Sequence, residues 1–193
     1  MPNLIFATNN EHKVRELRSI PGLNYQVITL KEANITIDIP EPHPTLEENA
    51  SEKSSVIYHL TGQDCFSEDT GLEVYALNMQ PGVKSARYAG ENKSSQDNIT
   101  KLLEELNGVE DRSARFRTVL SLRLHGKEYK FEGICKGTIL AYMRAEGGFG
   151  YDPVFVPEGS LKAFSEMDMS EKNNFSHRKK AVDKMTTFLS GVK

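Results

Sequence analysis

Four short segments of the chain carry polar side chains of the kinds that bind phosphate or a divalent metal. The first is TNNEHK, residues 8–13, which directly follows a short apolar run and begins a segment with helical spacing. In that position the backbone N–H groups and the Thr8 hydroxyl would point at an anion, and Lys13 would lie one turn into the helix. Thr8 serving only as the helix N-cap explains the same pattern, so both interpretations stay open.

The second segment, FSEDTGLEVY, contains two adjacent carboxylates, Glu68 and Asp69. With Glu41 and Glu48 they supply the oxygen ligands that Mg²⁺ prefers, and one or two protein carboxylates suffice when a substrate adds phosphate oxygens. Neighbouring strand residues point to opposite faces, so the pair would have separate roles unless a turn at Thr70–Gly71 interrupts the strand. A solvated loop between two strands is the simpler alternative.

The third and fourth segments, GGFGYDP (147–153) and EKNNFSHRKKA (171–181), lie in the last quarter of the chain. In the third, glycines permit close approach of the backbone, and Phe149 and Tyr151 offer flat surfaces on which a planar ring could stack. A glycine-rich turn with two core aromatics is the alternative. The fourth holds the densest basic cluster of the chain. A hydrophilic helix start is the alternative and explains the later lysines. Cations such as those of Ser-His-Arg at a helix N-terminus are disfavoured by the helix dipole unless an anion or polar ligand compensates, which favours a binding role.

Strand and helix patterns alternate around these four segments. The apolar run Asn3–Ala7, the helical spacing of Glu11–Ile20 and the strand-like residues 25–30 predict a βαβ unit with a parallel pair of strands. Thr45 with Glu48 three residues later forms a capping box for the next helix. The remaining expected features are an end of that helix near Leu60, strands on both sides of 68–69, a helix from Ser94 or Ser95 to before Gly108, a strand around Thr138–Arg144 and a last helix from near His177 to Leu189.

Residues 114–135 alternate between apolar and polar side chains, with a turn at HGKE. This period of two predicts a long antiparallel hairpin with one buried face. Arg115, Arg117 and Arg123 share the polar parity. We expect them to form a solvated face of the sheet, and a ligand-binding face is the alternative.

The composition indicates one soluble globular domain spanning residues 1–193. The chain is 38% hydrophobic and 26% charged, with a net charge of −3, which argues against nucleic acid as a partner because phosphate neutralisation needs a cationic surface. It has no membrane-spanning apolar run and no N-terminal targeting pattern, so we expect a cytoplasmic protein without a membrane partner. Cys65 and Cys135 lie in apolar, strand-like sequence and are expected to be buried thiols.

Six segments in order resemble the Ham1 family of inosine triphosphate pyrophosphatases, which act on non-canonical purine nucleotides. The resemblance implies an α/β fold with a long central mixed β-sheet flanked by helices and two lobes around a nucleotide-binding cleft. It also implies a homodimer and Mg²⁺-dependent hydrolysis of ITP, dITP or XTP to the monophosphate and pyrophosphate. The segments are FATNNEHKVREL, LEENASEKS, SEDTGLEVYAL, PGVKSARYAGEN, GGFGYDPVFVPEG and FSEMDMSEKNNFSHRKKA.

The same resemblance implies a role for each residue that matches a family motif. Asp69 would be the catalytic carboxylate and a metal ligand together with Glu41, and Glu68 is a further metal candidate. A pyrophosphatase with another base preference and a nucleotide-sensing module without turnover are the alternative functions. The implied substrate-binding residues are Thr8, Asn9, Asn10 and Lys13 for the triphosphate, Thr70 as a further contact, Phe149, Gly150, Tyr151 and Asp152 for the base, and Lys172, His177 and Arg178 for base and phosphates.

Overall fold

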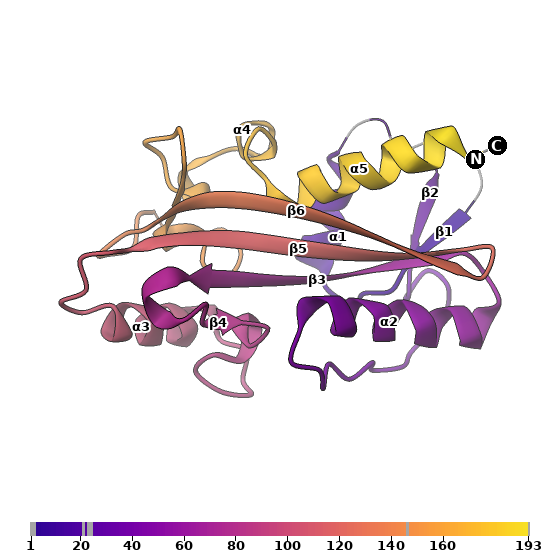
Figure 1. The fold of residues 1–193 in the computed structure, drawn as a ribbon, viewed down its shortest axis with the longest axis horizontal. Coiled ribbons are helices and arrows are strands. Elements are labelled where there is room, and N and C mark those ends of the chain that lie inside the picture. The colour runs from indigo at the N-terminus through magenta and orange to yellow at the C-terminus, as the bar shows by residue number, and fades with distance from the viewer. Residues whose placement is uncertain (1–2, 21, 23–24, 146, 193) are drawn as a thin grey trace. The chain divides into compact units, whose positions relative to one another are not determined.

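The structure is a computed structural model that describes residues 3–20, 22, 25–145 and 147–192. The described residues form a seven-stranded sheet with the strand order β2-β1-β3-β5-β6-β7, and β4 pairs with β3 (Figure 1). β1 is parallel to β2 and β3, whereas β4 is antiparallel to β3 and β7 to β6, so the predicted mixed sheet is confirmed. The strands are Asn3–Phe6 (β1), Gln26–Thr29 (β2), Cys65–Val74 (β3), Pro81–Gly82 (β4), Ser113–Leu124 (β5), Lys127–Ile139 (β6) and Phe155–Pro157 (β7).

The helices begin and end close to the predicted residues. α2 starts after Thr45, whose hydroxyl accepts a hydrogen bond from the Glu48 N–H. It ends at Gly62, whose φ of +65° is the left-handed conformation that favours glycine. The α-helices of the described chain are Glu11–Arg18 (α1), Leu46–Thr61 (α2), Ser95–Glu105 (α3), Met169–Asn173 (α4) and His177–Gly191 (α5).

None of the described helices combines the length and the hydropathy that a membrane span requires.

β3 runs without interruption through residues 70 and 71, so the alternative of a turn at Thr70–Gly71 is wrong. Gly71 instead marks a close approach between strands. A Cβ at position 71 would lie 2.5 Å from the carbonyl oxygen of Gly82 on β4. The absence of a side chain therefore allows β4 to pair with β3 at this point, where Leu72 is the register partner of Gly82.

A separate strand expected around Thr138–Arg144 does not form. β6 ends at Ile139, and the next residues bond to the segment before β7. The backbone N–H groups of Leu140 and Arg144 donate to the carbonyls of Val154 and Pro153.

The arginine face of β5 is not simply solvated. Arg115 and Arg117 donate from Nε to the two oxygens of the buried Glu73 carboxylate, at 2.6 and 3.1 Å. Their side chains are 27% and 15% exposed. A carboxylate on the neighbouring strand β3 therefore draws these arginines onto the sheet, which period-two alternation alone does not reveal.

The chain divides into two compact units, each built from separate stretches. Unit 1 comprises Met1–Asp69, Thr118–Gly133 and Arg178–Lys193, and unit 2 comprises Thr70–Arg117 and Ile134–His177. The boundaries fall within β3, β5, β6 and the first turn of α5, so no linker separates them. The single-domain assignment to residues 1–193 stays a prediction.

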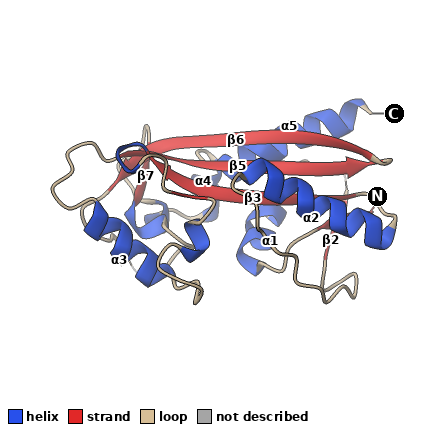
Figure 2. Cartoon of the chain, turned by 60° about the horizontal axis from the view of Figure 1, so that its bottom comes forward, coloured by secondary structure: helices blue, strands red, loops and turns tan. Residues whose placement is uncertain are grey.

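In unit 1, alternate residues of β1 and β3 pack against helices on opposite faces of the sheet. Phe6 and Phe66 stack with their ring centroids 4.5 Å apart and pack with α1 and α5. Ile5 and Cys65 pack with Ile57 of α2 on the other face. Figure 2 shows α2 in front of the strands and α5 behind them. Even-numbered residues in this part of β3 therefore face α1 and α5, and odd-numbered residues face α2.

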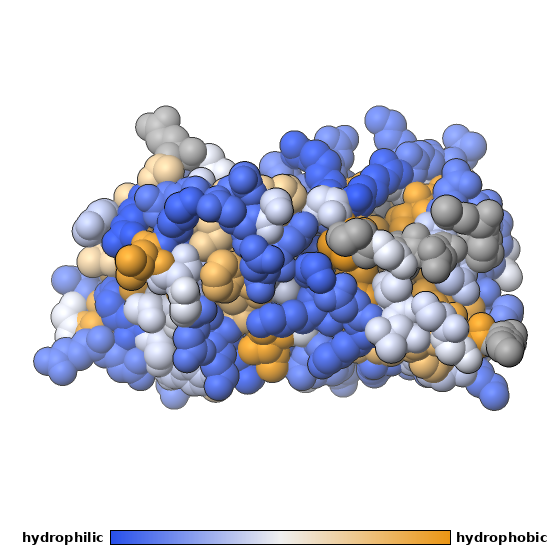
Figure 3. Space-filling view, turned by 90° about the horizontal axis from the view of Figure 1, so that it is seen from above, coloured by the Kyte–Doolittle hydropathy of each residue, from blue (hydrophilic) through white to orange (hydrophobic). Residues whose placement is uncertain are grey.

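The core of unit 2 is built on the other half of β3. Leu72 and Val74 pack with Ile99 and Leu102 of α3, together with aromatic residues near β7. The two cysteines, one in each unit, are buried free thiols as expected. In the face of the molecule shown in Figure 3, hydrophilic side chains predominate and hydrophobic ones form small separate patches.

Candidate active site

The carboxylates of Glu68 and Asp69 are buried on opposite faces of β3. Only 1% of Glu68 and 6% of Asp69 is exposed. Glu68 has the parity of Phe66 and faces α1 and α5, whereas Asp69 has the parity of Cys65 and faces α2. The adjacent pair therefore has two separate sets of neighbours.

Glu68 is surrounded by cations. Arg178 of α5 binds it with two nitrogens, Nε at 2.7 Å and Nη2 at 2.9 Å, and Lys13 of α1 lies 3.1 Å from Oε1. The third guanidinium nitrogen, Nη1, pairs with Glu16 of α1. Burial lowers the pKa of Arg178 to about 10, which leaves it charged at neutral pH. The buried group thus contains two anions and two cations that hold α1, β3 and α5 together.

Asp69 meets a different cation on the α2 face. The ammonium of Lys53 lies 3.5 Å from Oδ1 of Asp69 and also pairs with Glu41, which belongs to the irregular segment before α2. The Lys53 side chain is only 8% exposed. Lys53 therefore joins two carboxylates that are 28 residues apart in sequence.

The protonation of Asp69 is shifted by its surroundings. Burial raises the pKa of its carboxyl above the ordinary value, because the charged form loses hydration. Lys53 and Lys13 act in the opposite direction, Glu41 raises the pKa further, and a hydrogen bond from the Asn49 side chain lowers it. The net result is a carboxylate with a stronger affinity for a proton than an exposed one, which suits a general base.

The segment TNNEHK connects β1 to α1 as predicted, but its N-cap is Asn10. Oδ1 of Asn10 accepts hydrogen bonds from the N–H groups of His12 and Lys13, at 3.0 and 3.2 Å. The Thr8 hydroxyl accepts from the Asn10 N–H, and the Asn9 amide donates to the Ile37 carbonyl at 3.5 Å. The N-cap alternative for Thr8 is therefore wrong, and Thr8 shapes the turn that leads into α1.

In unit 2, the GGFGYDP segment is organised by Asp152. Its Oδ2 accepts from the Phe149 N–H at 2.8 Å and from the Lys172 ammonium at 2.7 Å. A Cβ on Gly148 would lie 2.8 Å from the Asp152 Cβ, so glycine is required for this tight loop. The structure thus brings together three of the predicted binding residues, from the third and fourth segments.

Other predicted binding residues of unit 2 lie in its interior. The Tyr151 ring is buried in the hydrophobic core, and its hydroxyl donates to the Ser85 carbonyl at 2.8 Å. The His177 ring stacks on Phe116 with centroids 4.8 Å apart. Thr70 and Gly150 are half-buried. The expectation that Tyr151 offers an open stacking face is wrong, because only 4% of this residue is exposed.

Sequence reasoning missed Lys53, Asn49 and Glu16. Asn49 and Lys53 follow Leu46 on α2 at positions i+3 and i+7, which is the face that also buries Ile57. A lysine at this spacing within an apolar face was the available signal, since an unpaired ammonium is rarely buried. Glu16 lies between Val14 and Leu17 on α1, where only its burial distinguishes it from a surface glutamate.

The donor set around Lys53 fits a hard divalent cation. Mg²⁺ is usually held by one or two carboxylates and completes its shell with water and substrate phosphates. Glu41 and Asp69 supply such a pair. Among the described residues, no group of three or more His, Cys, Asp and Glu side chains is arranged to hold a metal alone. Water, and the phosphates of a substrate when one is bound, would therefore provide the remaining ligands.

Comparison with known proteins identifies the family. The model of the Ham1 family matches residues 4–188. The dITP/XTP pyrophosphatase of Porphyromonas gingivalis is 49% identical over 191 residues, or 98% of both chains, and that of Flavobacterium johnsoniae is 45% identical over 98% of this chain and 99% of the relative. The solved Ham1 protein of Staphylococcus aureus superposes with a TM-score of 0.89 at 38% identity, covering 99% of this chain and all of the other. The chain therefore belongs to the Ham1 family.

Proposed function

We propose that this chain hydrolyses non-canonical purine nucleoside triphosphates, dITP, XTP and ITP, to the nucleoside monophosphate and pyrophosphate with Mg²⁺. The observation that carries the proposal is the partly buried group Glu41–Lys53–Asp69 on the α2 face of β3. It combines an oxygen donor pair, a cation and a carboxylate of raised pKa. The names of the relatives supply the substrate class.

In the proposed reaction a water oxygen attacks the α-phosphorus, and the bond from this phosphorus to the bridging oxygen of pyrophosphate breaks. Asp69 accepts the proton of the water. A Mg²⁺ held by Glu41 and Asp69 would neutralise charge that develops on the phosphates. Lys13 and Lys53 bind phosphate oxygens and orient the triphosphate for attack.

The proposed base selection rests on hydrogen-bond donors. Hypoxanthine and xanthine carry a 6-keto acceptor, whereas adenine carries a 6-amino donor that would leave a donor of the protein unsatisfied. Arg178 is our candidate donor, and Glu68 and Glu16 hold all three of its nitrogens in a defined orientation. In this proposal Glu68 positions Arg178 and Lys13, and its role as a metal ligand is the alternative.

The other predicted binding residues keep their assignments in this proposal. The base is bound near Phe149, whose N–H is fixed by Asp152, and Lys172 is oriented by the same carboxylate. Tyr151 shapes this loop from the core. The remaining residues proposed to contact substrate are Thr8, Asn9, Asn10, Thr70, Gly150 and His177.

Steady-state release of pyrophosphate from ITP, dITP, XTP, GTP, ATP and dUTP tests the proposal, with Mg²⁺ and with EDTA. We expect the first three to be preferred and turnover to stop without a divalent metal. Preference for ATP over ITP would refute the assignment. Tight binding of ITP without pyrophosphate release would favour a nucleotide-sensing module instead.

We also retain a homodimer, a cytoplasmic location and the absence of a nucleic-acid partner as parts of the proposal. The net charge of −3 supports the last of these. Light scattering of the purified chain would give its mass directly, and a monomer at working concentrations would refute the homodimer.

A further inference from the structure

The segment that carries Glu41 has little regular structure to hold it. Residues 35–44 belong to no helix or strand, and all of them lie in the described chain. Pro42 and Pro44 on either side of His43 have no N–H to donate. Isoleucine side chains at 35, 37 and 39 anchor the first half of the segment on the core of unit 1. The position of Glu41 therefore depends on what holds the second half.

Asn49 of α2 fixes the second half of this segment by two hydrogen bonds to the backbone of His43. Its Oδ1 accepts from the His43 N–H at 2.9 Å, and its Nδ2 donates to the His43 carbonyl at 3.2 Å. The residue is 1% exposed. The paired bonds resemble those between adjacent strands and fix the backbone two residues after Glu41.

Asn49 also reaches the second carboxylate of the pair. A hydrogen bond from its side chain reaches the Asp69 carboxylate. An amide NH₂ has two donors, so one group can serve both the His43 carbonyl and Asp69. The Asn49 amide thus contacts the strand that carries Asp69 and the segment that carries Glu41.

Lys53, one turn further along α2, joins the same two carboxylates by charge. A divalent cation would compete with its ammonium for these oxygens, whereas the neutral Asn49 amide makes its contacts whether or not the cation is bound. We infer that Asn49 is a positioning residue that keeps Glu41 beside Asp69 when a divalent cation binds them. This inference rests on the metal pair named in the proposed function.

Binding of Mn²⁺ to the full chain without nucleotide tests the inference. The signal of free Mn²⁺ in electron paramagnetic resonance gives the affinity of the wild type and of Asn49→Ala. We expect Asn49→Ala to weaken Mn²⁺ binding about 10- to 100-fold, the usual effect of removing a group that orients metal ligands. Amide hydrogen exchange at His43 should accelerate in the same variant. If Asn49→Ala does not fold, Asn49→Ser, which cannot make both His43 bonds, is measured in its place.

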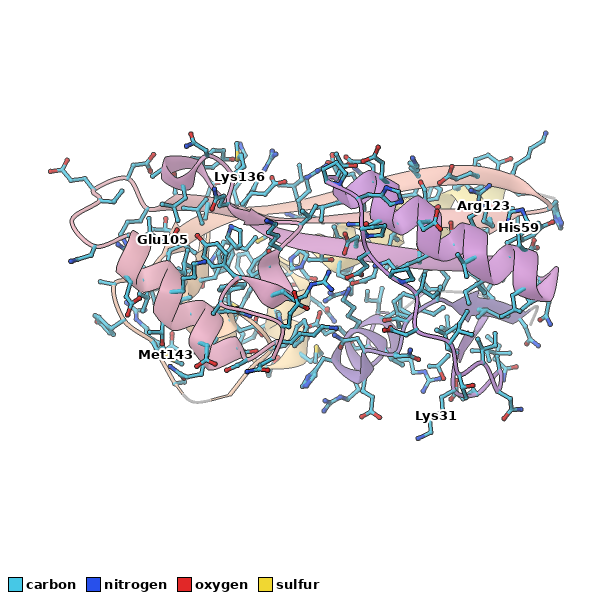
Figure 4. All side chains as sticks on the ribbon, turned by 90° about the horizontal axis from the view of Figure 1, so that it is seen from below. Lys31, His59, Glu105, Arg123, Lys136 and Met143 are labelled. Atoms are coloured by element: carbon cyan, nitrogen blue, oxygen red, sulfur yellow. The ribbon has the colours of Figure 1, made fainter. Side chains whose placement is uncertain are left out.

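The matched control is Asn98→Ala on α3, the helix that also carries Glu105 (Figure 4). Asn98 is buried and makes the same pair of bonds in unit 2, accepting from the Ala89 N–H at 2.7 Å and donating to the Ala86 carbonyl at 3.0 Å. It therefore reproduces the loss of a buried amide in the unit that carries neither of the two carboxylates. We expect its Mn²⁺ affinity to equal that of the wild type.

Three results would overturn the inference: unchanged Mn²⁺ affinity in a folded Asn49 variant, equal weakening in Asn98→Ala, or no Mn²⁺ binding by the wild type. Turnover of dITP is measured on the same samples. Absence of turnover in a wild type that binds Mn²⁺ would refute the proposed function and leave the Asn49 comparison valid. Normal turnover with unchanged affinity in Asn49→Ala would refute the inference alone.

Discussion

Replacing Glu68 by Ala should destabilise the protein strongly. The carboxylate makes two hydrogen bonds to Arg178, at 2.7 and 2.9 Å, and an ion pair with Lys13 at 3.1 Å, and it is almost fully buried. Removal of one partner from a buried ion pair costs about 3–5 kcal/mol, because the remaining charge loses its compensation. Glu16 still pairs with Arg178 and should keep the loss near the lower end of that range. A protein of this kind has only about 5–15 kcal/mol of stability in total.

Urea unfolding followed by circular dichroism measures this loss, first in EDTA and then with Mg²⁺. Asp183→Asn is the matched control, since the side chains of the Asp183–Lys179 pair on α5 are 47% and 28% exposed and the pair should contribute less than about 1 kcal/mol. We expect the loss of unfolding free energy in Glu68→Ala to be equal in both buffers. A loss below about 1 kcal/mol would refute the ion-pair account. A deficit that appears only with Mg²⁺ would show that Glu68 acts through the metal.

Two further predictions concern a surface carboxylate and a strand contact. Hydrogen bonding to Arg18 is the largest cause that lowers the pKa of Glu32 from 4.5 to about 2. A depressed carboxyl pKa stabilises the fold above the unfolded value, so the advantage of the wild type over Glu32→Gln should be complete above pH 4.5 and vanish as the pH falls through about 2. If the difference in urea unfolding midpoint between the wild type and Glu32→Gln stays constant over this pH range, this prediction is wrong. Gly71→Ala places a Cβ 2.5 Å from the Gly82 carbonyl oxygen and should cost roughly 1–3 kcal/mol of unfolding free energy in the same urea assay. An unchanged midpoint would show that β4 moves aside without cost.

Local signals in the sequence predicted the elements well where a chemical marker was present. The capping box at Thr45 and the glycine at position 62 gave the two ends of α2. The turn HGKE gave the hairpin, whose connecting residues His125 and Gly126 both have positive φ. Such markers act over a few residues, so no tertiary information is needed to read them.

Prediction failed where a residue's role depends on a distant partner. Gly71 looks like a turn signal, but it accommodates β4, which lies eleven residues further along the chain. Arg115 and Arg117 look like a solvated face, but Glu73 on the neighbouring strand pairs with both. The roles of these residues depend on pairing between strands, which the alternation of residues within one strand does not predict.

In the candidate site too, local features were predictable from the sequence, whereas contacts with distant partners were not. Strand alternation correctly separates the surroundings of Glu68 and Asp69, because it is a local property of β3. The partners of these carboxylates, Lys53, Asn49 and Arg178, come from α2 and α5, which only the fold brings to β3. A buried lysine on an apolar helical face was the one sequence signal that could have revealed Lys53.

The most direct test of the central claim is pyrophosphate release from dITP by Asp69→Asn at saturating Mg²⁺. We expect this variant to fold and bind dITP but to lose about 10²- to 10⁴-fold in turnover, the usual contribution of a general base. Glu104→Gln, which neutralises an exposed carboxylate on α3, should match the wild type. Turnover of Asp69→Asn within a few-fold of the wild type would contradict the assignment of Asp69 as the catalytic carboxylate.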